Sequence, residues 1–414
     1  MSITSNAEYA RIQFATLAGL EQALLKYWNI ESSPESAIVI QGDENWIFTD
    51  GGPARHSLHL HNLKTAQLHP QTTYRYQVGA VNVQSETQWS SIYEFHTPSR
   101  DDDFHFLVVS DMGINNAVAY KHLVKLAKEH THDFVAMVGD QAYDMADQNG
   151  SKGDQYMNFV QELYARLPFL GTPGNHESLY NFTHYKNRFN ILPFQESGFE
   201  NPDMYSIDYK SLHLVSFSTE VLFEGSDAEI ETALHWLDND LRKANKHRQK
   251  RPWVVVFSHR PLYCSTQTIS QDCTYRAAHV RNGVSDFDLR TFSPGIEKLL
   301  VERNVDLYIS GHVHNYERTY PVTNGTVTAR TYTDAPSLFH LVVGNAGQPE
   351  RPDLFNSTGP YADWSAFRFD GYGYTDIKVT PTSLELIHRE TKTDGTLGDI
   401  VDRVTVTKDV KKYN

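Results

Sequence analysis

The feature that most constrains this chain is a series of five short apolar segments, each followed at once or nearly so by a polar residue able to bind a metal ion. The segments cover residues 104–110, 134–138, 168–172, 253–258 and 305–310. Apolar runs of this length are typical of strands buried on both faces. Because α/β sheets place their ligands beyond the carboxyl ends of the strands, we expect the polar residues to share one cavity. These residues are Asp111, Asp140, Asn175, His259 and His312.

The stretches between these segments indicate how the strands are connected. Residues 114–130 and 155–167 have apolar residues at helical spacing, which predicts a helix in each. Strands that alternate with helices are typical of an α/β core. Residues 337–407 return to short alternating patterns and predict further strands.

The first part of the chain reads differently, as mostly β structure. Strands are predicted at 37–41, 57–63 and 73–83, while residues 9–27 do not alternate cleanly and are predicted to be partly helical. This gives about five strands, fewer than the seven of a complete immunoglobulin-like sandwich. The polar run 97–103 is the predicted linker. We therefore expect two domains, residues 1–98 and 99–414.

The charge of the chain excludes two classes of partner. Its 51 acidic and 37 basic residues give a formal charge of −14, which disfavours binding to nucleic acid or to an anionic membrane. No apolar run has the length needed to span a bilayer, and no signal-peptide pattern is present in this chain. A phosphate substrate would need local positive charge, which bound metal ions supply.

Two further residues extend the polar set into a candidate binuclear centre. Tyr143 lies three residues after Asp140, and His314 lies two residues after His312, so the two histidines can face one cavity. Carboxylate and phenolate oxygens suit Fe(III), whereas carboxamide and imidazole suit Zn(II), Fe(II) or Mn(II). The two oxygens of Asp140 can bridge two ions. Such ions, roughly 3.5–4 Å apart, clamp the attacking and leaving oxygens of an in-line displacement.

The alternative is a structural α/β domain whose polar loop ends are incidental. Each motif alone is weak, since an Asp-X-Gly is usually a turn and a tyrosine such as Tyr143 is often a packing residue. That reading needs five coincidences in one order along the chain, so we favour the metal centre.

The motifs resemble those of a known family. The matching segments are Ser110-Asp111-Met112-Gly113, Gly139-Asp140-Gln141-Ala142-Tyr143, Gly174-Asn175-His176-Glu177, Ser258-His259 and Gly311-His312-Val313-His314. They resemble the purple acid phosphatases, within the calcineurin-like metallophosphoesterases, and Tyr143 is the distinguishing element. The resemblance covers roughly residues 50–407 and is closest to the animal long-form, two-domain type. It implies a four-layer α/β/β/α sandwich preceded by a smaller fibronectin-III-like β-sandwich that lacks some strands.

The resemblance also implies roles for individual residues. Asp140 would bridge the two metals, and His176 would bind phosphate or protonate the leaving group. The implied activity is hydrolysis of phosphate monoesters, small-molecule substrates, by metal-bound hydroxide at an Fe(III)–M(II) centre. A phosphodiesterase or pyrophosphatase on the same site, and a non-catalytic extracellular binding protein, remain as alternatives. Asp111, Tyr143 and His314 would hold Fe(III); Asn175, His259 and His312 would hold the divalent Zn, Fe or Mn.

The chain departs from the plant members after His259. Where those enzymes carry further histidines, this chain has Thr268 and Ile269, which leaves the leaving-group acid open. His279 is a substitute candidate, although a surface histidine is the simpler reading.

Two features favour the secretory pathway, either extracellular or lysosomal. Cys264 and Cys273 are the only cysteines, and either they pair across a polar loop, which we favour, or they are two idle thiols. Asn-X-Ser/Thr acceptor triplets, which also arise by chance, occur at Asn149, Asn181, Asn324 and Asn356.

Overall fold

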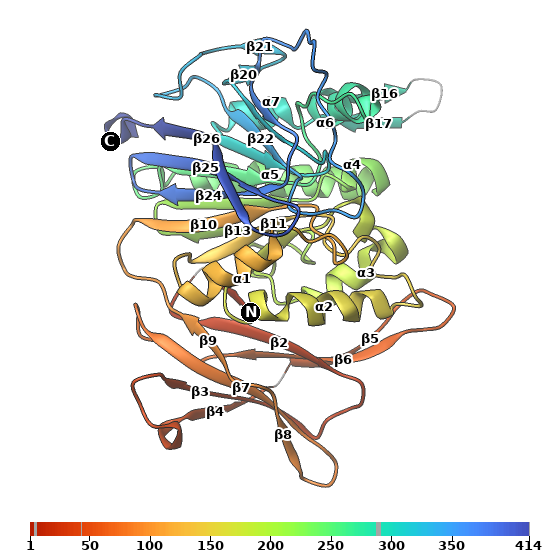
Figure 1. Cartoon of the computed structure of the whole chain (residues 1–414), viewed down its shortest axis with the longest axis vertical. Coiled ribbons are helices and arrows are strands. Elements are labelled where there is room, and N and C mark those ends of the chain that lie inside the picture. Colours follow the sequence, from red (N-terminus) through yellow and green to blue (C-terminus); the bar gives the residue numbers. More distant parts are fainter. Residues whose placement is uncertain (4–5, 43, 287–290, 414) are drawn as a thin grey trace.

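The computed structural model describes residues 1–3, 6–42, 44–286 and 291–413. It contains a β-sandwich at one end and a larger α/β region at the other (Figure 1). No helix among the described residues is long and apolar enough to cross a membrane.

The N-terminal sandwich has two sheets. One has the strand order β1-β2-β6-β5, and the other β4-β3-β7-β8, with β9 also paired to β7. Their facing side chains, among them Ile12, Leu25 and Tyr76, form a separate small core. The strands are β1 (Ser2–Ile3), β2 (Ala10–Thr16), β3 (Gln22–Asn29), β4 (Ile38–Gln41), β5 (Glu44–Thr49), β6 (Ser57–Lys64), β7 (Thr73–Val81), β8 (Thr87–Trp89) and β9 (Tyr93–His96), with a 3-10 turn at Pro34–Ser36.

Two predictions for this domain were wrong. Residues 9–27 are not partly helical but form β2 and most of β3, and the described residues give nine strands instead of about five. The alternation is broken because residues 17–21 are a turn between two strands, so no single period fits the whole stretch. The shortage of strands that we expected is therefore not found.

The α/β region contains two sheets packed face to face. The first has the order β12-β11-β10-β24-β25-β26 and the second β13-β14-β15-β18-β22-β19-β23. Aromatic side chains fill the space between them; for example, the rings of Phe104 and Tyr209 lie 4.9 Å apart, edge to face. The strands are β10 (Phe104–Val109), β11 (Phe134–Val138), β12 (Phe169–Thr172), β13 (Met204–Tyr209), β14 (Leu212–Phe217), β15 (Trp253–Phe257), β18 (Leu307–Ser310), β19 (Tyr316–Thr319), β22 (Phe339–Val343), β23 (Ser365–Phe369), β24 (Gly373–Val379), β25 (Ser383–Thr391) and β26 (Leu397–Thr407).

Helices cover the outer faces and complete the four layers. Helix α1 (Tyr120–Glu129) and α2 (Ser151–Tyr164) lie between the first sheet and the N-terminal sandwich (Figure 1). Helix α5 (Asp227–Asn245) buries Leu237 and Leu241 against the second sheet, with α7 (Glu297–Glu302) beside it. This α/β/β/α arrangement confirms the expected fold class. The shorter elements are α3 (Leu179–Arg188), α4 (Val221–Glu224), α6 (Ala277–Asn282), β16 (Gly283–Asp286), β17 (Thr291–Pro294), β20 (Val322–Thr323), β21 (Thr326–Val327), a π turn at Asp272–Arg276, and 3-10 turns at Asn175–Glu177 and Val410–Tyr413.

The predicted helix over 114–130 is too long, because residues 114–119 form turns and α1 begins only at Tyr120. These turns belong to the loop that follows Asp111, so backbone geometry at the site overrides the local helical pattern.

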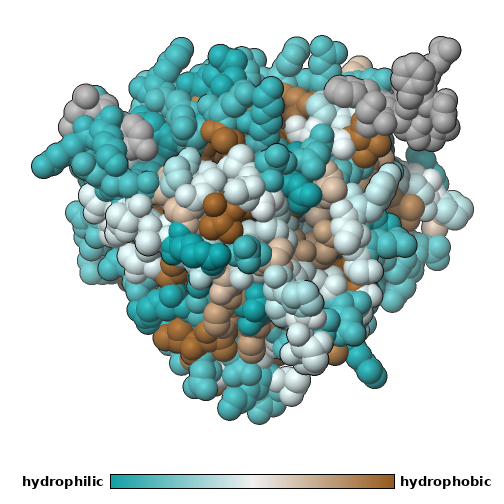
Figure 2. Space-filling view, turned by 90° about the horizontal axis from the view of Figure 1, so that it is seen from above, coloured by the Kyte–Doolittle hydropathy of each residue, from teal (hydrophilic) through white to brown (hydrophobic). Residues whose placement is uncertain are grey.

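The N-terminal sandwich and the α/β region are in direct contact. The hydroxyl of Tyr76 donates to the carbonyl oxygen of Ala165 at 2.7 Å, and the indole of Trp46 donates to Asn187 at 2.9 Å. The amide of Phe169, at the start of β12, donates to the carbonyl oxygen of Met1. The opposite end of the molecule presents mostly hydrophilic residues, with hydrophobic ones in small groups (Figure 2).

Candidate metal centre

The seven predicted ligand residues come from five loops at the carboxyl ends of parallel strands. Strands β10, β11 and β12 are parallel neighbours in one sheet, and β15 pairs in parallel with β18 in the other. Each strand ends at one of the predicted motifs, so the two sheets bring all five loops to the same edge. Asp111, Asp140 and His259 are almost fully buried there.

Backbone strain is concentrated at these residues. Asp111, Asp140, Tyr143 and His312 have φ values of 56°, 48°, 54° and 67°. A left-handed conformation is uncommon for residues other than glycine and costs roughly 1–3 kcal/mol each when the surroundings enforce it. Four such residues among seven indicate that the loops are held in shapes required by the site.

The side chains fall into two adjoining groups. In the first, the Tyr143 hydroxyl lies 3.5 Å from Asp111 Oδ1 and 3.1 Å from His314 Nε2. His314 Nε2 is also 3.5 Å from Asp111 Oδ1. These three atoms come from three separate loops and converge on one another.

The second group surrounds His259. Its Nε2 lies 3.1 Å from Asp140 Oδ2 and 3.2 Å from Asn175 Oδ1, while its Nδ1 donates to the carbonyl oxygen of Val138. The ring of His312 stands edge-on, 5.0 Å from that of His259. Candidate ligand atoms of Asp140, His259 and His312 all lie within 4.8 Å of one another.

Two glycines allow this close approach. A Cβ atom at Gly174 would overlap Asp140 Oδ1, and one at Gly311 would overlap Ser110 Oγ and crowd Asp111. Only glycine leaves room for the carboxylates at these positions.

The electrostatics suit a cationic occupant. Burial raises the pKa of Tyr143 well above 10, and Asp111 and Asp140 raise it further. Burial alone would also raise the pKa of Asp140, but His259, His176 and His312 hold it well below its usual range. Burial lowers the pKa of His259, yet the Asp140 carboxylate raises it to about 10. Opposite charges thus already compensate each other here, and a cation would take the place of the imidazole protons.

His176 lies beside the second group. Its Nδ1 is 3.2 Å from both carboxylate oxygens of Asp144, and its Nε2 is 4.0 Å from Asp140 Oδ2. Its ring packs 4.7 Å from that of Tyr143, and 28% of its side chain is exposed. The side chain is therefore both anchored and reachable by a ligand.

Sequence reasoning missed the residues that orient these side chains. Glu177 accepts hydrogen bonds from the amides of Asp140, Gln141 and Gly174 at 2.8–3.0 Å and so ties two ligand loops together. Its place in the Gly-Asn-His-Glu motif was a usable signal, because a buried glutamate needs partners.

Two more supporting residues act on His312. Asp272 Oδ1 lies 3.0 Å from His312 Nε2, and Arg260 Nη1 lies 3.1 Å from the same nitrogen. Glu220 holds Arg260 through three contacts of 2.9–3.1 Å. Asp272 is 40 residues from His312 in sequence, and no local pattern announced it.

The disulfide loop bears on the site through Asp272. Cys264 and Cys273 are bonded, which confirms the favoured pairing, and Cys273 directly follows Asp272. The hydroxyl of Thr268 accepts a hydrogen bond from the amide of Leu354 at 3.0 Å. His279 is half-buried with its ring 4.5 Å from Phe223, so it is not the simple surface histidine that we expected.

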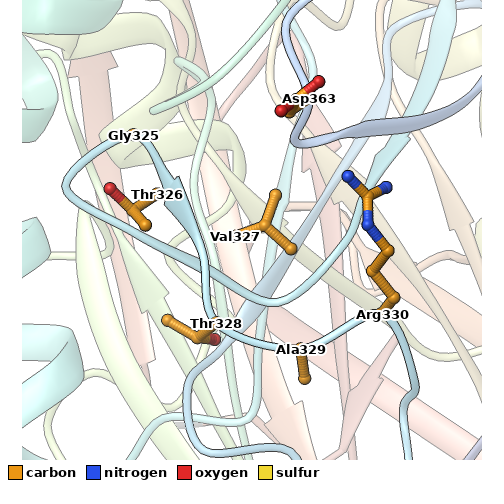
Figure 3. A pocket seen from close by; sticks show the side chains of 7 residues that line it. All are labelled: Gly325, Thr326, Val327, Thr328, Ala329, Arg330 and Asp363. Carbon is orange, nitrogen blue, oxygen red and sulfur yellow. The ribbon is translucent and has the colours of Figure 1, made fainter.

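A surface hollow elsewhere does not coincide with this centre. It measures about 580 Å³ and is lined by residues 325–330 and Asp363, beside the β20–β21 hairpin (Figure 3). None of the seven predicted ligands lines it, and Arg330 is its one cationic lining residue.

The residues present fit a pair of metal ions. Three carboxylate or phenolate oxygens, one carboxamide and three imidazoles converge at one buried edge, and the two groups are linked by the amide of His312, which donates to Asp111 Oδ2 at 2.9 Å. Hard and borderline ligands of this kind are those expected for iron and zinc.

Comparisons with known proteins agree with the geometry. Residues 104–316 match the family model for calcineurin-like phosphoesterases, and residues 337–400 match that for the iron/zinc purple acid phosphatase-like C-terminal region. Human acid phosphatase type 7 is 34% identical over 384 residues, covering 91% of this chain and 83% of the human protein. The mouse protein of the same name is 35% identical and covers 87% and 80%.

A solved structure shares the fold. The purple acid phosphatase from yellow lupin (Lupinus luteus) seeds superposes with a TM-score of 0.76 at 21% identity, covering 100% of this chain and 74% of that one. A match at this identity speaks for the architecture, while the family models and the animal relatives speak for descent. Both family and fold imply a dimetal centre. This chain belongs to the purple acid phosphatases, a branch of the calcineurin-like phosphoesterases.

Proposed function

We propose that this protein is an acid phosphatase that hydrolyses small-molecule phosphate monoesters at a binuclear Fe(III)–M(II) centre. The observation that carries the proposal is the convergence of seven side chains into two adjoining groups. The names of the animal relatives, acid phosphatase type 7, favour the same activity.

The two groups differ in the chemistry of their ligand atoms. Asp111, Tyr143 and His314 would hold Fe(III), since two of the three offer anionic oxygen. Asn175, His259 and His312 would hold the divalent ion, Zn, Fe or Mn. Asp140 would bridge, because it lies with His259 and His312 in the second group and its charge also acts on Tyr143 in the first. When bound, the ions supply an activated water and neutralise charge on the phosphoryl group.

His176 is the residue that we assign to the substrate. Burial lowers the pKa of His176, but Asp144 and Asp140 raise it to about 9, so the ring is cationic in acid. Bound cations would oppose part of this effect. With Nδ1 held by Asp144, Nε2 is free to donate a proton to a phosphoryl oxygen or to the departing alkoxide, which is a poor leaving group.

Asp272 is proposed to fix the orientation of His312. A carboxylate that accepts from one ring nitrogen leaves the other nitrogen to bind metal and raises its basicity. Here Nε2 faces Asp272, so Nδ1 is the atom that would bind. Arg260, held by Glu220, adds positive charge next to the same ring.

The proposal is tested by turnover of p-nitrophenyl phosphate and of bis(p-nitrophenyl) phosphate from pH 4 to 8. We expect the monoester to be preferred and the rate to be highest in acid. Asn175→Ala and His312→Ala should each lose most activity and divalent metal, because each removes a direct ligand. His235→Ala, on the exposed face of α5, is the matched control.

Each alternative predicts a different result. Preference for the diester would replace the monoesterase with a phosphodiesterase. Absence of turnover in protein that has both ions bound would favour a non-catalytic binding protein. Near-wild-type turnover in both ligand variants would contradict the site itself.

We also propose that the protein acts outside the cell or in the lysosome. The Cys264–Cys273 disulfide and the exposure of the four acceptor asparagines support passage through the secretory pathway. A shift in mass after treatment with a glycosidase, in protein from a eukaryotic host, would test this.

A further inference from the structure

A second cluster of metal-ligand side chains lies away from the phosphatase centre. His105 is near the amino end of β10, His132 follows α1, and Asp376 is in β24, the strand beside β10. Asp111 lies beyond the opposite end of β10, six residues from His105. At about 3.3 Å per residue that is roughly 20 Å. The cluster is thus separate from the seven residues of the proposed dimetal site.

The separations within the cluster match those of a tetrahedral metal site. Asp376 Oδ1 lies 3.5 Å from His105 Nδ1 and 3.4 Å from His132 Nε2. All candidate ligand atoms lie within 4.8 Å of one another. Bonds of about 2.0–2.1 Å in tetrahedral geometry put neighbouring ligand atoms about 3.3–3.4 Å apart. A single ion can therefore reach all three groups with small side-chain movements.

Hydrogen bonding does not explain why two buried atoms of the cluster, one from His132 and one from Asp376, face each other. His132 Nε2 and Asp376 Oδ1 are both buried, and neither has a hydrogen-bond partner among the residues that the structure describes. The side chain of His132 is only 5% exposed, and its Nδ1 lies 2.9 Å from Thr131 Oγ1, which directs Nε2 into the cluster. The two atoms face each other as an ion pair whose geometry is not that of a normal hydrogen bond, so an ion between them would satisfy both.

The surroundings leave a path for an ion. The side chains of His105 and Asp376 are 39% and 19% exposed, so water can reach one side of the cluster. Burial would raise the pKa of Asp376, but His105 and His132 hold it far below its usual range, which keeps the carboxylate ionised. Two basic residues lie on the neighbouring strand positions. Lys378 in β24 stands opposite His105 in β10 on one side and Glu385 in β25 on the other, and Arg389 in β25 stands opposite Tyr374 in β24.

We propose that His105, His132 and Asp376 form a peripheral site for a transition-metal dication of the zinc class, with water in the fourth position. Two imidazoles and one carboxylate are a frequent ligand set for zinc. The ion would join β10 and β24 of the first sheet to the connection between α1 and β11. The site is independent of the phosphatase activity.

The test is a count of zinc in the full-length protein. Wild type, His105→Asn and His130→Asn are saturated with Zn²⁺, dialysed against metal-free buffer and measured by mass spectrometry of the metal. His105 is partly exposed, so its replacement should fold. His130→Asn is the matched control, because His130 ends α1 in a left-handed conformation (φ 53°) that asparagine tolerates.

We expect His105→Asn to bind one zinc equivalent fewer than wild type and His130→Asn to bind the same number. A vacant or mismetallated phosphatase centre changes the zinc total of all three proteins alike. The readout is therefore the difference between the variants. Anomalous diffraction at the zinc edge should place the extra ion among the three side chains. Equal zinc in all three proteins, or no anomalous peak there, would overturn the proposal. If all three proteins bind equal zinc and His105→Asn is less stable than wild type only at low pH, the cluster is a set of protonated histidines around Asp376. That result would also overturn the proposal.

Discussion

A buried histidine between two carboxylates makes the stability of this protein depend on pH. His213 in β14 has Nδ1 2.8 Å from Asp208 Oδ1 and Nε2 2.8 Å from Asp240 Oδ2, and its side chain is 7% exposed. Asp208 is in β13 and Asp240 is in α5. The histidine, in β14, therefore joins two strands of the second sheet to the helix that covers it. Burial lowers the pKa of His213, but hydrogen bonds to both carboxylates raise it to about 9.

The size of the effect follows from linkage. A pKa raised from 6.5 to about 9 corresponds to about 3 kcal/mol of folding free energy. Because the folded-state pKa is the higher one, this stability is fully present below pH 6.5 and is lost as pH rises through 9. His213 holds the pKa of Asp208 below its usual range, so the pair is strongest in mild acid, where the imidazole is protonated.

The assay compares thermal unfolding of wild type and His213→Gln between pH 6 and 9.5. For a domain of about 300 residues, 3 kcal/mol corresponds to roughly 4–5 °C in Tm. We expect the gap between the two proteins to be largest at pH 6 and to shrink by about that amount at pH 9.5. His235→Gln, on the exposed face of α5, should track wild type at every pH. A gap that is constant or grows with pH would refute the reasoning.

Two other predictions concern the residues that support the metal ligands. Glu177→Gln should lower the affinity for both metal ions about tenfold or more, since one amide oxygen cannot accept from all three backbone amides that the carboxylate holds. Metal titration measures this affinity, with the exposed Glu224→Gln variant as the control. Equal affinities in the two variants would show that the loops hold their shape without Glu177. Cys273→Ser should weaken the divalent site selectively, because the disulfide anchors the segment that carries Asp272; unchanged divalent affinity with lower Tm would limit the disulfide to a structural role.

The strand-end residues were accessible from sequence for a physical reason. Strands buried on both faces read as unbroken apolar runs, so Asp140 after β11 or His259 after β15 stands out at once. Parallel pairing then brings such ends together. The residue pattern therefore predicted the α/β core and the seven candidate ligands that the fold brings to one edge, whereas the four layers were implied by the family resemblance.

The supporting contacts were not accessible in the same way. Asp272 reaches His312, and Glu220 reaches Arg260, from segments 40 residues away. Contacts of this kind depend on how loops fold over one another and have no period in the sequence. The same limit applies to β2 and β3, where one turn at residues 17–21 hid two strands behind an irregular pattern.

The proposed Fe(III) ligand Tyr143 allows the most direct test of the dimetal centre. A phenolate bound to Fe(III) absorbs visible light by charge transfer, and Tyr143→Phe removes only the oxygen that lies among Asp111 and His314. The measurement is the visible spectrum of oxidised, iron-loaded wild type and of the Phe variant, with metal content determined on the same samples. The account predicts a visible band in wild type that is lost in Tyr143→Phe while the protein stays folded. A colourless wild type with iron bound, or an unchanged band in the variant, would contradict it.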